Sequence, residues 1–272
     1  MRKIALLFIA AVLGVAPAYS QTQRPDYLTP EDSTLSGGDS MFSAKYYSLV
    51  TDVLAEGYTG SVSLRAVVLP SFWPEYLVGL RNTGEGKDVG HRVFYLRPTI
   101  HLSDYETLRM LQTGEMKFSG AKYSDDWNSV KFEDPTKARA DWINQLKSRL
   151  PVNPKDVPLA RCERPLDPTV AQHITTAWIG ALRETRHPPG YPGLRLDGIG
   201  YHFSADLQWE GVITDRILFK SIIAGQTWSP PRDSKPGKLA ELADTLVQYC
   251  DGKAEATELQ KQADALVERL GK

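Results

Sequence analysis

Five histidines are the residues of this sequence best suited to acid-base chemistry or metal binding, because imidazole titrates near neutral pH and ligates metals. They are His91, His101, His173, His187 and His202. No two of them lie three to five residues apart and none belongs to a His-Glu-x-x-His pattern, the spacings typical of zinc sites. The sequence therefore predicts no metal site and no cofactor.

His202 alternates with apolar residues along a predicted strand, so its side chain points to the face opposite theirs. If that face meets solvent or a groove, the imidazole can bind a ligand or titrate, whereas a covering helix would make His202 a core residue. A hydrolase could pair one of two histidines, His202 or His91, with a carboxylate. Asp197 and Asp88 are candidate partners. His173 borders the apolar stripe of a predicted helix and is expected to be structural.

Two serines stand in patterns that resemble catalytic blocks, but their surroundings favour structural roles. Ser40 ends a Gly-Asp-Ser sequence similar to that of a serine esterase family, yet no core strand precedes it and the family's Gly-x-Asn-Asp block is missing. Ser119 stands three residues before Lys122, the spacing of penicillin-interacting enzymes, but the companion Lys-Thr-Gly element is absent. We expect Ser40 to cap a helix and Ser119 to lie in a loop, and we predict no catalytic residue.

The most unusual loop runs over residues 186–195, where three prolines are interspersed with Arg, His and Tyr residues. Prolines reduce the freedom that a loop loses on ordering, and Arg and Tyr dominate protein interfaces. The pattern predicts a preorganised recognition loop, the alternative being a rigid connector between a helix and a strand. Together with the aromatic residues that follow the loop, the candidate binding residues are Arg186, His187, Tyr191, Arg195, Tyr201, His202 and Trp228.

The N-terminus has the pattern of a secretory signal. Arg2 and Lys3 precede an apolar run over residues 4–13, which is too short to span a bilayer, and small residues stand at Ala18 and Ser20. We expect residues 1–20 to be removed before Gln21, leaving a periplasmic or secreted chain without stable membrane insertion. Cysteines in such a compartment pair. The only two, Cys162 and Cys250, are therefore predicted to form a disulfide, the alternative being two buried free thiols.

Composition excludes several classes of partner. Hydrophobic residues make up 42% of the chain and charged residues 24%, which is ordinary for a protein with a full core. The formal charge is −1, so there is no basic excess with which to bind nucleic acid or an anionic membrane.

The apolar periodicity predicts helices and strands in an α+β fold with a largely antiparallel sheet, because strands come in runs joined by short turns. Residues 21–40 are polar and are expected to be a flexible leader. A possible capping box, from Ser103 to Glu106, predicts the start of a short helix. Further helices are expected over residues 41–57 and 134–150, and three more are expected to begin at Asp167, Ser234 and Glu255. Strands are expected over residues 61–69, 75–81, 92–99, 159–163, 198–205, 207–212 and 216–224.

Three prolines within residues 151–158 mark the best internal boundary. It predicts either two similar lobes, over 41–150 and 159–272, or one domain with a rigid crossover. The disulfide would brace the C-terminal half.

Segments 196–204, 225–230 and 236–239, with Tyr249, resemble the C-terminal part of an uncharacterised family of exported proteobacterial proteins. The resemblance implies a bacterial periplasmic setting and no known activity, and it transfers no catalytic residue. An exported, disulfide-braced scaffold without a catalytic pattern favours a non-enzymatic binding protein, such as an inhibitor or immunity protein that binds a toxin or envelope enzyme. The alternatives are a hydrolase with a dispersed His/carboxylate site and an envelope assembly factor.

Overall fold

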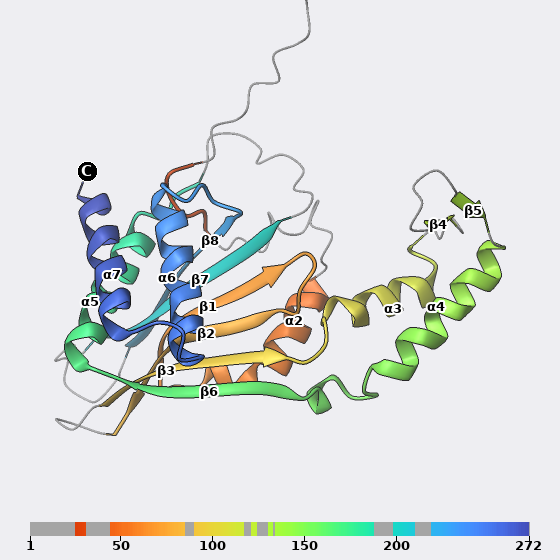
Figure 1. Ribbon diagram of the computed structural model, residues 1–272, viewed down its shortest axis with the longest axis horizontal. Helices are drawn as coiled ribbons and strands as arrows, with labels where there is room; N and C mark the ends of the chain where they lie inside the picture. The colour runs from red at the N-terminus through yellow and green to blue at the C-terminus, as the bar shows by residue number, and fades with distance from the viewer. Residues whose placement is uncertain are drawn as a thin grey trace, which may run out of the picture.

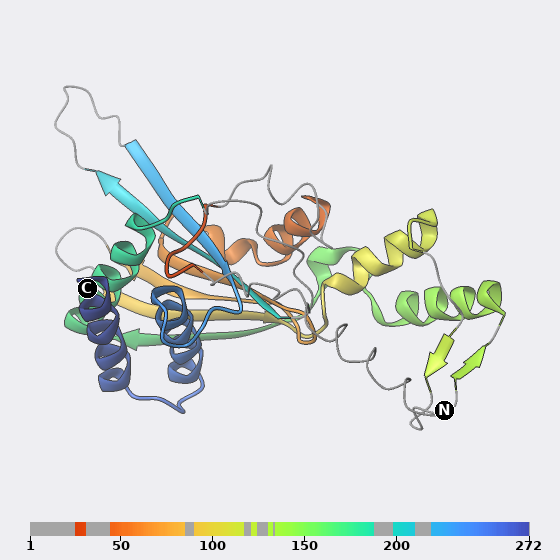
Figure 2. The same cartoon turned by 90° about the horizontal axis from the view of Figure 1, so that it is seen from above.

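Six antiparallel strands form the centre of the fold, in the order β6-β3-β2-β1-β7-β8 (Figure 1). The computed structural model describes residues 25–30, 44–84, 90–116, 121–123, 130–132, 134–187, 198–209 and 219–271. Helices pack on both faces of the sheet (Figure 2), which confirms the predicted α+β class. The strands are β1 (Val62–Pro70), β2 (Tyr76–Thr83), β3 (Gly90–Pro98), β6 (Leu159–Leu166), β7 (Ile199–Trp209) and β8 (Phe219–Trp228).

The sheet joins the two halves of the chain that the Pro-rich segment 151–158 separates. β1 pairs with β2 along one edge and with β7 along the other, and β3 pairs with β6. Strands from both sides of the boundary therefore share one ladder of hydrogen bonds and one core. The two halves form a single sheet and not two separate ones.

Three helices, α5 (Pro168–Arg183), α6 (Lys235–Cys250) and α7 (Ala256–Leu270), cover one face of the sheet. Two of these helices, α5 and α6, have the N-terminal caps that the sequence predicts. Asp167 accepts hydrogen bonds from the amides of Thr169 and Val170, and Ser234 accepts one from Gly237. Trp178 is fully buried beneath this layer and packs edge-to-face on Phe203, with ring centroids 5.3 Å apart.

The opposite face is covered by α2 (Ala44–Val53) and the 3-10 turn η1 (Ala55–Tyr58). Their buried side chains, among them Tyr46 and Val50, pack with Leu77 and Phe94 of the sheet. Two cores thus lie on either side of the same strands, which is why β1 reads as an almost continuous apolar run towards its C-terminal end.

An arm inserted between β3 and β6 extends away from the sheet (Figure 1). It contains α3 (Ser103–Thr113), β4 (Ala121–Tyr123), β5 (Val130–Phe132), α4 (Pro135–Arg149) and η2 (Pro154–Asp156). Asp134 caps α4 as predicted, and Arg139 of α4 donates hydrogen bonds to the carbonyl of Leu111 in α3. The arm has a small core of its own in Leu111, Leu146 and Leu150.

The predicted disulfide is present and joins β6 to α6 through Cys162 and Cys250. It closes a stretch of 88 residues that includes α5, β7 and β8. No helix of the described part of the chain is both long and apolar enough to cross a membrane.

Residues 25–30 of the expected leader belong to the folded body. Leu28 is 1% exposed and packs in the core beneath the three helices, where Gly225 leaves room for its side chain. Thr29 exchanges two backbone hydrogen bonds with Gln226 of β8, at 2.9 and 2.7 Å. Asp26 accepts a hydrogen bond from the amide of Lys235 at the start of α6. The buried Leu28 side chain and these hydrogen bonds together anchor the segment.

Candidate functional site

Two adjacent aromatic residues project from the connection between β1 and β2. Phe72 is 70% exposed and Trp73 is 72% exposed, more than any other aromatic side chain given for the described residues. Large aromatic side chains rarely remain so accessible in a folded protein unless they contact a partner. They are the first candidates for a binding role.

Hydrogen bonds hold this connection rigidly against β7. The amide and hydroxyl of Ser71 both donate to the carbonyl of Gly198 at 2.9 Å, and the hydroxyl accepts from the Gly198 amide at 3.0 Å. Beside them, Ile199 and Ser229 exchange two hydrogen bonds, at 2.9 and 2.8 Å. The aromatic pair therefore stands on a framework that is ordered before any partner binds.

Trp228 lies over a glycine platform next to this framework. A Cβ atom at Gly198 would come within 2.5 Å of the indole nitrogen of Trp228, and one at Gly200 within 3.2 Å of its ring carbons. Ser229, the next residue, has a φ of 39°, an uncommon value for a non-glycine residue. Only glycine permits the ring to lie this close to the backbone. We call the surface formed by Phe72, Trp73, Ile199 and Trp228 the tip surface.

The other flank of the tip is held by a buried carboxylate. Glu75 is completely buried and accepts hydrogen bonds from the hydroxyl of Tyr46, the amide of Leu102 at 2.8 Å and the amide of Ser103 at 3.1 Å. The ring nitrogen Nδ1 of His101 lies 2.9 Å from the same carboxylate. Residues of α2 and of the segment that opens α3 thus converge on one side chain, which stands directly before β2.

This arrangement replaces the capping box predicted over Ser103 to Glu106. The helix α3 has Leu102 at its N-cap position and no side chain of its own that caps it. Glu75, from a different element, accepts the free amides instead, and Glu106 pairs with Arg109 at 2.8 Å. The prediction was wrong because a local pattern cannot show that a distant carboxylate already satisfies these amides.

The pKa values of Glu75 and His101 are shifted in opposite directions. Burial by itself would raise the pKa of Glu75, but the hydrogen bond and charge of His101, together with the hydrogen bonds from Tyr46 and Leu102, hold that pKa below its ordinary value. Burial would likewise lower the pKa of His101, yet the hydrogen bond and charge of Glu75 raise it. Each partner therefore stabilises the ionised form of the other.

The geometry of this cluster differs from that of a catalytic triad. His101 Nδ1 lies 2.8 Å from the hydroxyl of Ser103 and 2.9 Å from Glu75, so both partners meet the same nitrogen. A triad needs the nucleophile and the carboxylate on different ring nitrogens, so that a proton can pass through the ring. His101 Nε2 is buried. The cluster braces the root of the arm.

The predicted binding residues do not gather on one surface. Tyr201 is buried beneath α6, where its hydroxyl and that of Tyr76 donate to Asp244 at 3.3 and 2.8 Å. Burial raises the pKa of Asp244. Tyr201 consequently serves the core, because an inward-facing strand position places its ring under the helix. His202 points to the other face of the sheet and packs edge-to-face on Tyr47 of α2, at 5.5 Å.

The remaining candidates lie elsewhere. Arg186 stacks on the ring of Tyr27 at 4.1 Å and holds residues 25–30 against the body, and His187 is exposed beside it. Trp228 shares its sheet face with His202 and belongs to the tip surface. Tyr191 and Arg195 lie outside the described residues, as do Ser40, Asp88, Ser119 and Asp197.

Two other predicted histidines have surface partners. His91 Nδ1 lies 3.1 Å from the amide oxygen of Asn82, and His173 Nδ1 lies 2.6 Å from Asp264 of α7. Within the part of the chain that is described, no group of three or more His, Cys, Asp or Glu side chains is placed to hold a metal ion.

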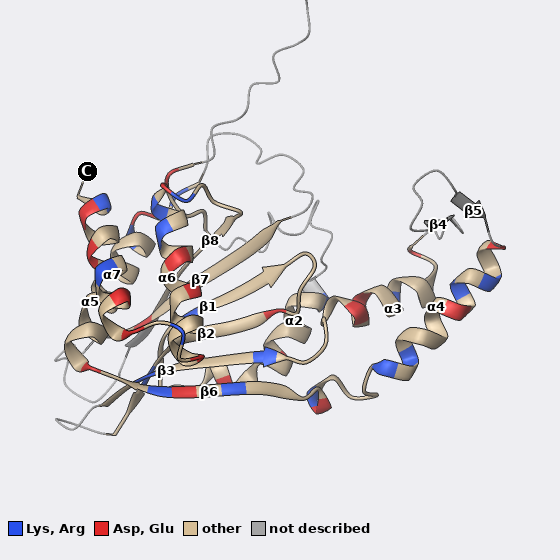
Figure 3. Cartoon of the chain, viewed as in Figure 1, with Lys and Arg blue, Asp and Glu red and all other residues tan. Residues whose placement is uncertain are grey.

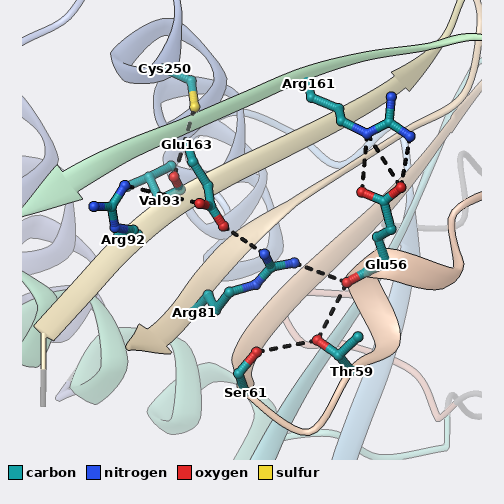
Figure 4. A network of polar contacts seen from close by, with 9 residues as sticks. All are labelled: Glu56, Thr59, Ser61, Arg81, Arg92, Val93, Arg161, Glu163 and Cys250. Carbon is teal, nitrogen blue, oxygen red and sulfur yellow. Dashed lines mark hydrogen bonds and ion pairs between the residues drawn. The ribbon is translucent and has the colours of Figure 1, made fainter. Parts of the chain in front are cut away.

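A second polar network lies at the far end of the sheet (Figure 4). Arg81 of β2 pairs with Glu163 of β6 at 2.6 Å and donates to the carbonyl of Glu56 at 2.9 Å, while Arg161 pairs with the Glu56 carboxylate at 2.7 Å. These charges satisfy one another and tie β6 to η1. The network is partly exposed and therefore contributes little stability per pair.

Sequence reasoning missed Phe72, Trp73 and Glu75 as functional or bracing residues. The signal for the first two was present, since two aromatic residues stand between two predicted strands, where polar turn residues are usual. For Glu75 there was none, because an acidic residue at the start of a strand is ordinary. No family model matches the chain, and no curated protein or solved structure matches it either.

Proposed function

We propose that this chain is an exported, non-enzymatic binding protein of the bacterial envelope that contacts a protein partner through its tip surface. The partner class we favour is a toxin or an envelope enzyme, which makes the chain an inhibitor or immunity protein. The single observation that carries the proposal is the pair Phe72 and Trp73, exposed by 70% and 72% on a hydrogen-bonded framework.

The composition of the tip surface supports a protein partner. Trp and Phe anchors bury large areas and are typical of the central residues of protein interfaces. Because Ser71 and Gly198 already fix the connection, little conformational freedom remains to be lost on binding. A rigid projecting anchor is the kind of feature with which an inhibitor fills a pocket of its target.

Export is supported by three features. The first twenty residues have the pattern of a secretory signal, Cys162 and Cys250 form a disulfide, and the described helices include no membrane span. The geometry of the Ser103-His101-Glu75 cluster supports a non-enzymatic role, since its hydroxyl and carboxylate meet one nitrogen.

The experiment is site-specific photo-crosslinking in the native host. A photoreactive phenylalanine analogue replaces Trp73 in one variant and Val152, an exposed apolar residue on the segment before η2, in another. We expect the Trp73 position to yield one discrete adduct with an envelope protein and the Val152 position to yield none. Cell fractionation of the same cultures tests export directly.

The captured protein is then purified and titrated with the wild-type chain. We expect Trp73→Ala to weaken binding at least tenfold, about 1.4 kcal/mol, with an unchanged unfolding free energy. An inhibitor or immunity protein must also abolish the activity of its target at equal molar amounts. Equal affinities for wild type, Phe72→Ala and Trp73→Ala would refute the tip surface as the binding site.

A further inference from the structure

The hairpin formed by β7 and β8 extends past the rest of the sheet (Figure 2). The pairing of β7 with β1 ends at Leu64 and Ala205, whereas its pairing with β8 continues to Trp209 and Phe219. The end of this hairpin is therefore a two-stranded ribbon, an arrangement that is only marginally stable without a third strand or a covering element.

Beyond Gln226, no other described strand pairs with the outer edge of β8. Gln226 exchanges its outward-facing backbone hydrogen bonds with Thr29, so the alternate residues Ala224 and Ile222 face the same edge. Among the described residues, neither of these two has a partner for its outward amide or carbonyl. The Ile222 side chain is also 53% exposed. The edge thus offers both hydrogen bonds and apolar surface.

The two edges of the sheet are built differently. The edge strand β6 carries Arg161, Glu163 and Arg164, and Pro165 removes one backbone donor (Figure 3). Charges and proline are the usual protection of an edge against pairing with another chain. Residues 221–225 of β8, Ser-Ile-Ile-Ala-Gly, contain neither a charge nor a proline. The β8 edge lacks the protection that the β6 edge has.

We infer that a second copy of this chain pairs with the β8 edge, antiparallel and around a two-fold axis at Ile222. In such a pair Ile222 lies opposite its own counterpart, and Ala224 lies opposite the counterpart of Lys220, so every outward backbone group finds a partner. The two exposed Ile222 side chains meet on one face of the joined sheet.

Thr29 selects this register among those that the edge allows. An axis at Ala224 would place the counterpart of Ile222 against Gln226, where Thr29 already pairs. With the axis at Ile222, the counterpart of Phe219, the first residue of β8, lies opposite Gly225, so no residue of the second β8 strand meets Gln226. An axis at Lys220 would leave Ile222 and Ala224 opposite residues 218 and 216, which precede β8. A formal charge of −1 for the whole chain leaves no strong repulsion between copies.

The pairing edge and the tip surface lie at opposite ends of β7. The tip surface includes Ile199, where β7 begins, while the ribbon contains Trp209, where it ends. A dimer through β8 therefore leaves both tip surfaces free. The dimer and the binding role of the tip surface can be tested independently of each other.

The test is sedimentation velocity on the purified protein at concentrations up to about 100 µM, where a dimer with micromolar Kd is populated. Ile222→Lys places a charge at the centre of the contact. Ala224→Pro removes only an outward amide, because that amide does not bond to β7. Val267→Lys is the matched control, because Val267 is an apolar residue of α7 that is 42% exposed. We expect wild type and control to dimerise and both edge variants to remain monomeric.

A second measurement does not depend on the folding of those variants. Since both native cysteines are in a disulfide, Ile222→Cys introduces a single thiol. A short bismaleimide should link Ile222→Cys into a covalent dimer and leave Val267→Cys monomeric. Circular dichroism checks that each variant is folded. A monomeric wild type throughout the concentration range, or a dimer unaffected by both edge substitutions, would overturn the inference.

Discussion

The carboxylate of Glu75 accepts a hydrogen bond from the backbone amide of Leu102 at 2.8 Å, so a residue of the β1–β2 connection caps the helix that opens the arm. Glu75 lies in the same connection as Phe72 and Trp73, two residues after Trp73. The same side chain therefore fixes the tip surface on one side and the arm on the other. Its contacts with Tyr46 and His101 extend this link to α2.

Glu75→Gln should destabilise the protein by about 2–3 kcal/mol, because buried donors lose a charged acceptor while the side-chain volume is kept. Urea unfolding followed by circular dichroism measures the change. Glu241→Gln, which breaks the surface pair with Lys238, is the control and should have little effect. If both variants lose equally little, the buried carboxylate is not a stabilising centre.

Stability should be highest between about pH 4.5 and pH 6.5, given the Glu75–His101 pair. The pKa of His101 is raised above its ordinary 6.5, so the contribution of the protonated ring is complete below that value and is lost as pH rises through the folded pKa. The pKa of Glu75 is lowered below its ordinary 4.5, so its contribution is complete above that value and is lost as pH falls through the folded pKa.

The variant His101→Gln separates this pair from the other titrating groups. In wild type the unfolding free energy, measured by urea between about pH 4 and pH 9, should decline as pH rises above the ordinary His101 pKa of 6.5, and this decline should be absent in His101→Gln. His173→Gln, which removes a histidine from an exposed pair with Asp264, is the matched control. An unaltered profile in His101→Gln would contradict the assignment.

Removal of the disulfide, by Cys162→Ser together with Cys250→Ala, should lower the unfolding free energy by about 2–4 kcal/mol. The bond closes 88 residues and attaches α6 to the edge strand β6. Wild type in reducing buffer should unfold at the same urea concentration as the double variant. A reduced wild type as stable as the oxidised form would show that packing alone holds α6 in place.

Leu28→Ala should cost about 2–4 kcal/mol, the range for truncating a buried leucine. The reason is that Leu28 fills the core beside Gly225, although it belongs to a polar N-terminal segment. Val267→Ala on the exposed side of α7 serves as the comparison. Limited proteolysis should also cut Leu28→Ala faster near residues 25–30. Wild-type stability in this variant would mean that the segment is only loosely attached.

Local patterns predicted much of the fold. Alternation of apolar residues identified the strands of the central sheet, although it divided β7 into two predicted strands and missed β4 and β5. Asp134, Asp167 and Ser234 marked the starts of their helices, because a cap acts within a few residues of the backbone that it satisfies. The disulfide was predicted from two cysteines in a chain whose first residues have the pattern of a secretory signal. These features depend only on residue identity or on residues that are close in the sequence.

Contacts between distant residues could not be read in this way. Whether His202 met a helix, whether Tyr201 was covered and whether Leu28 was buried depended on which elements packed together. The capping box at Ser103 failed for the same reason, since Glu75 lies 27 residues before Leu102.

The amino-acid order by itself determined the element types, most helix starts, the covalent link and the secretory pattern, because each follows from local periodicity, capping or composition. The tertiary structure alone decided that Phe72 and Trp73 stand exposed on a braced tip, that the two halves share one sheet, and that β8 is an edge strand among the described strands. Those properties arise from the pairing of strands far apart in the chain, and burial is defined only once that pairing exists.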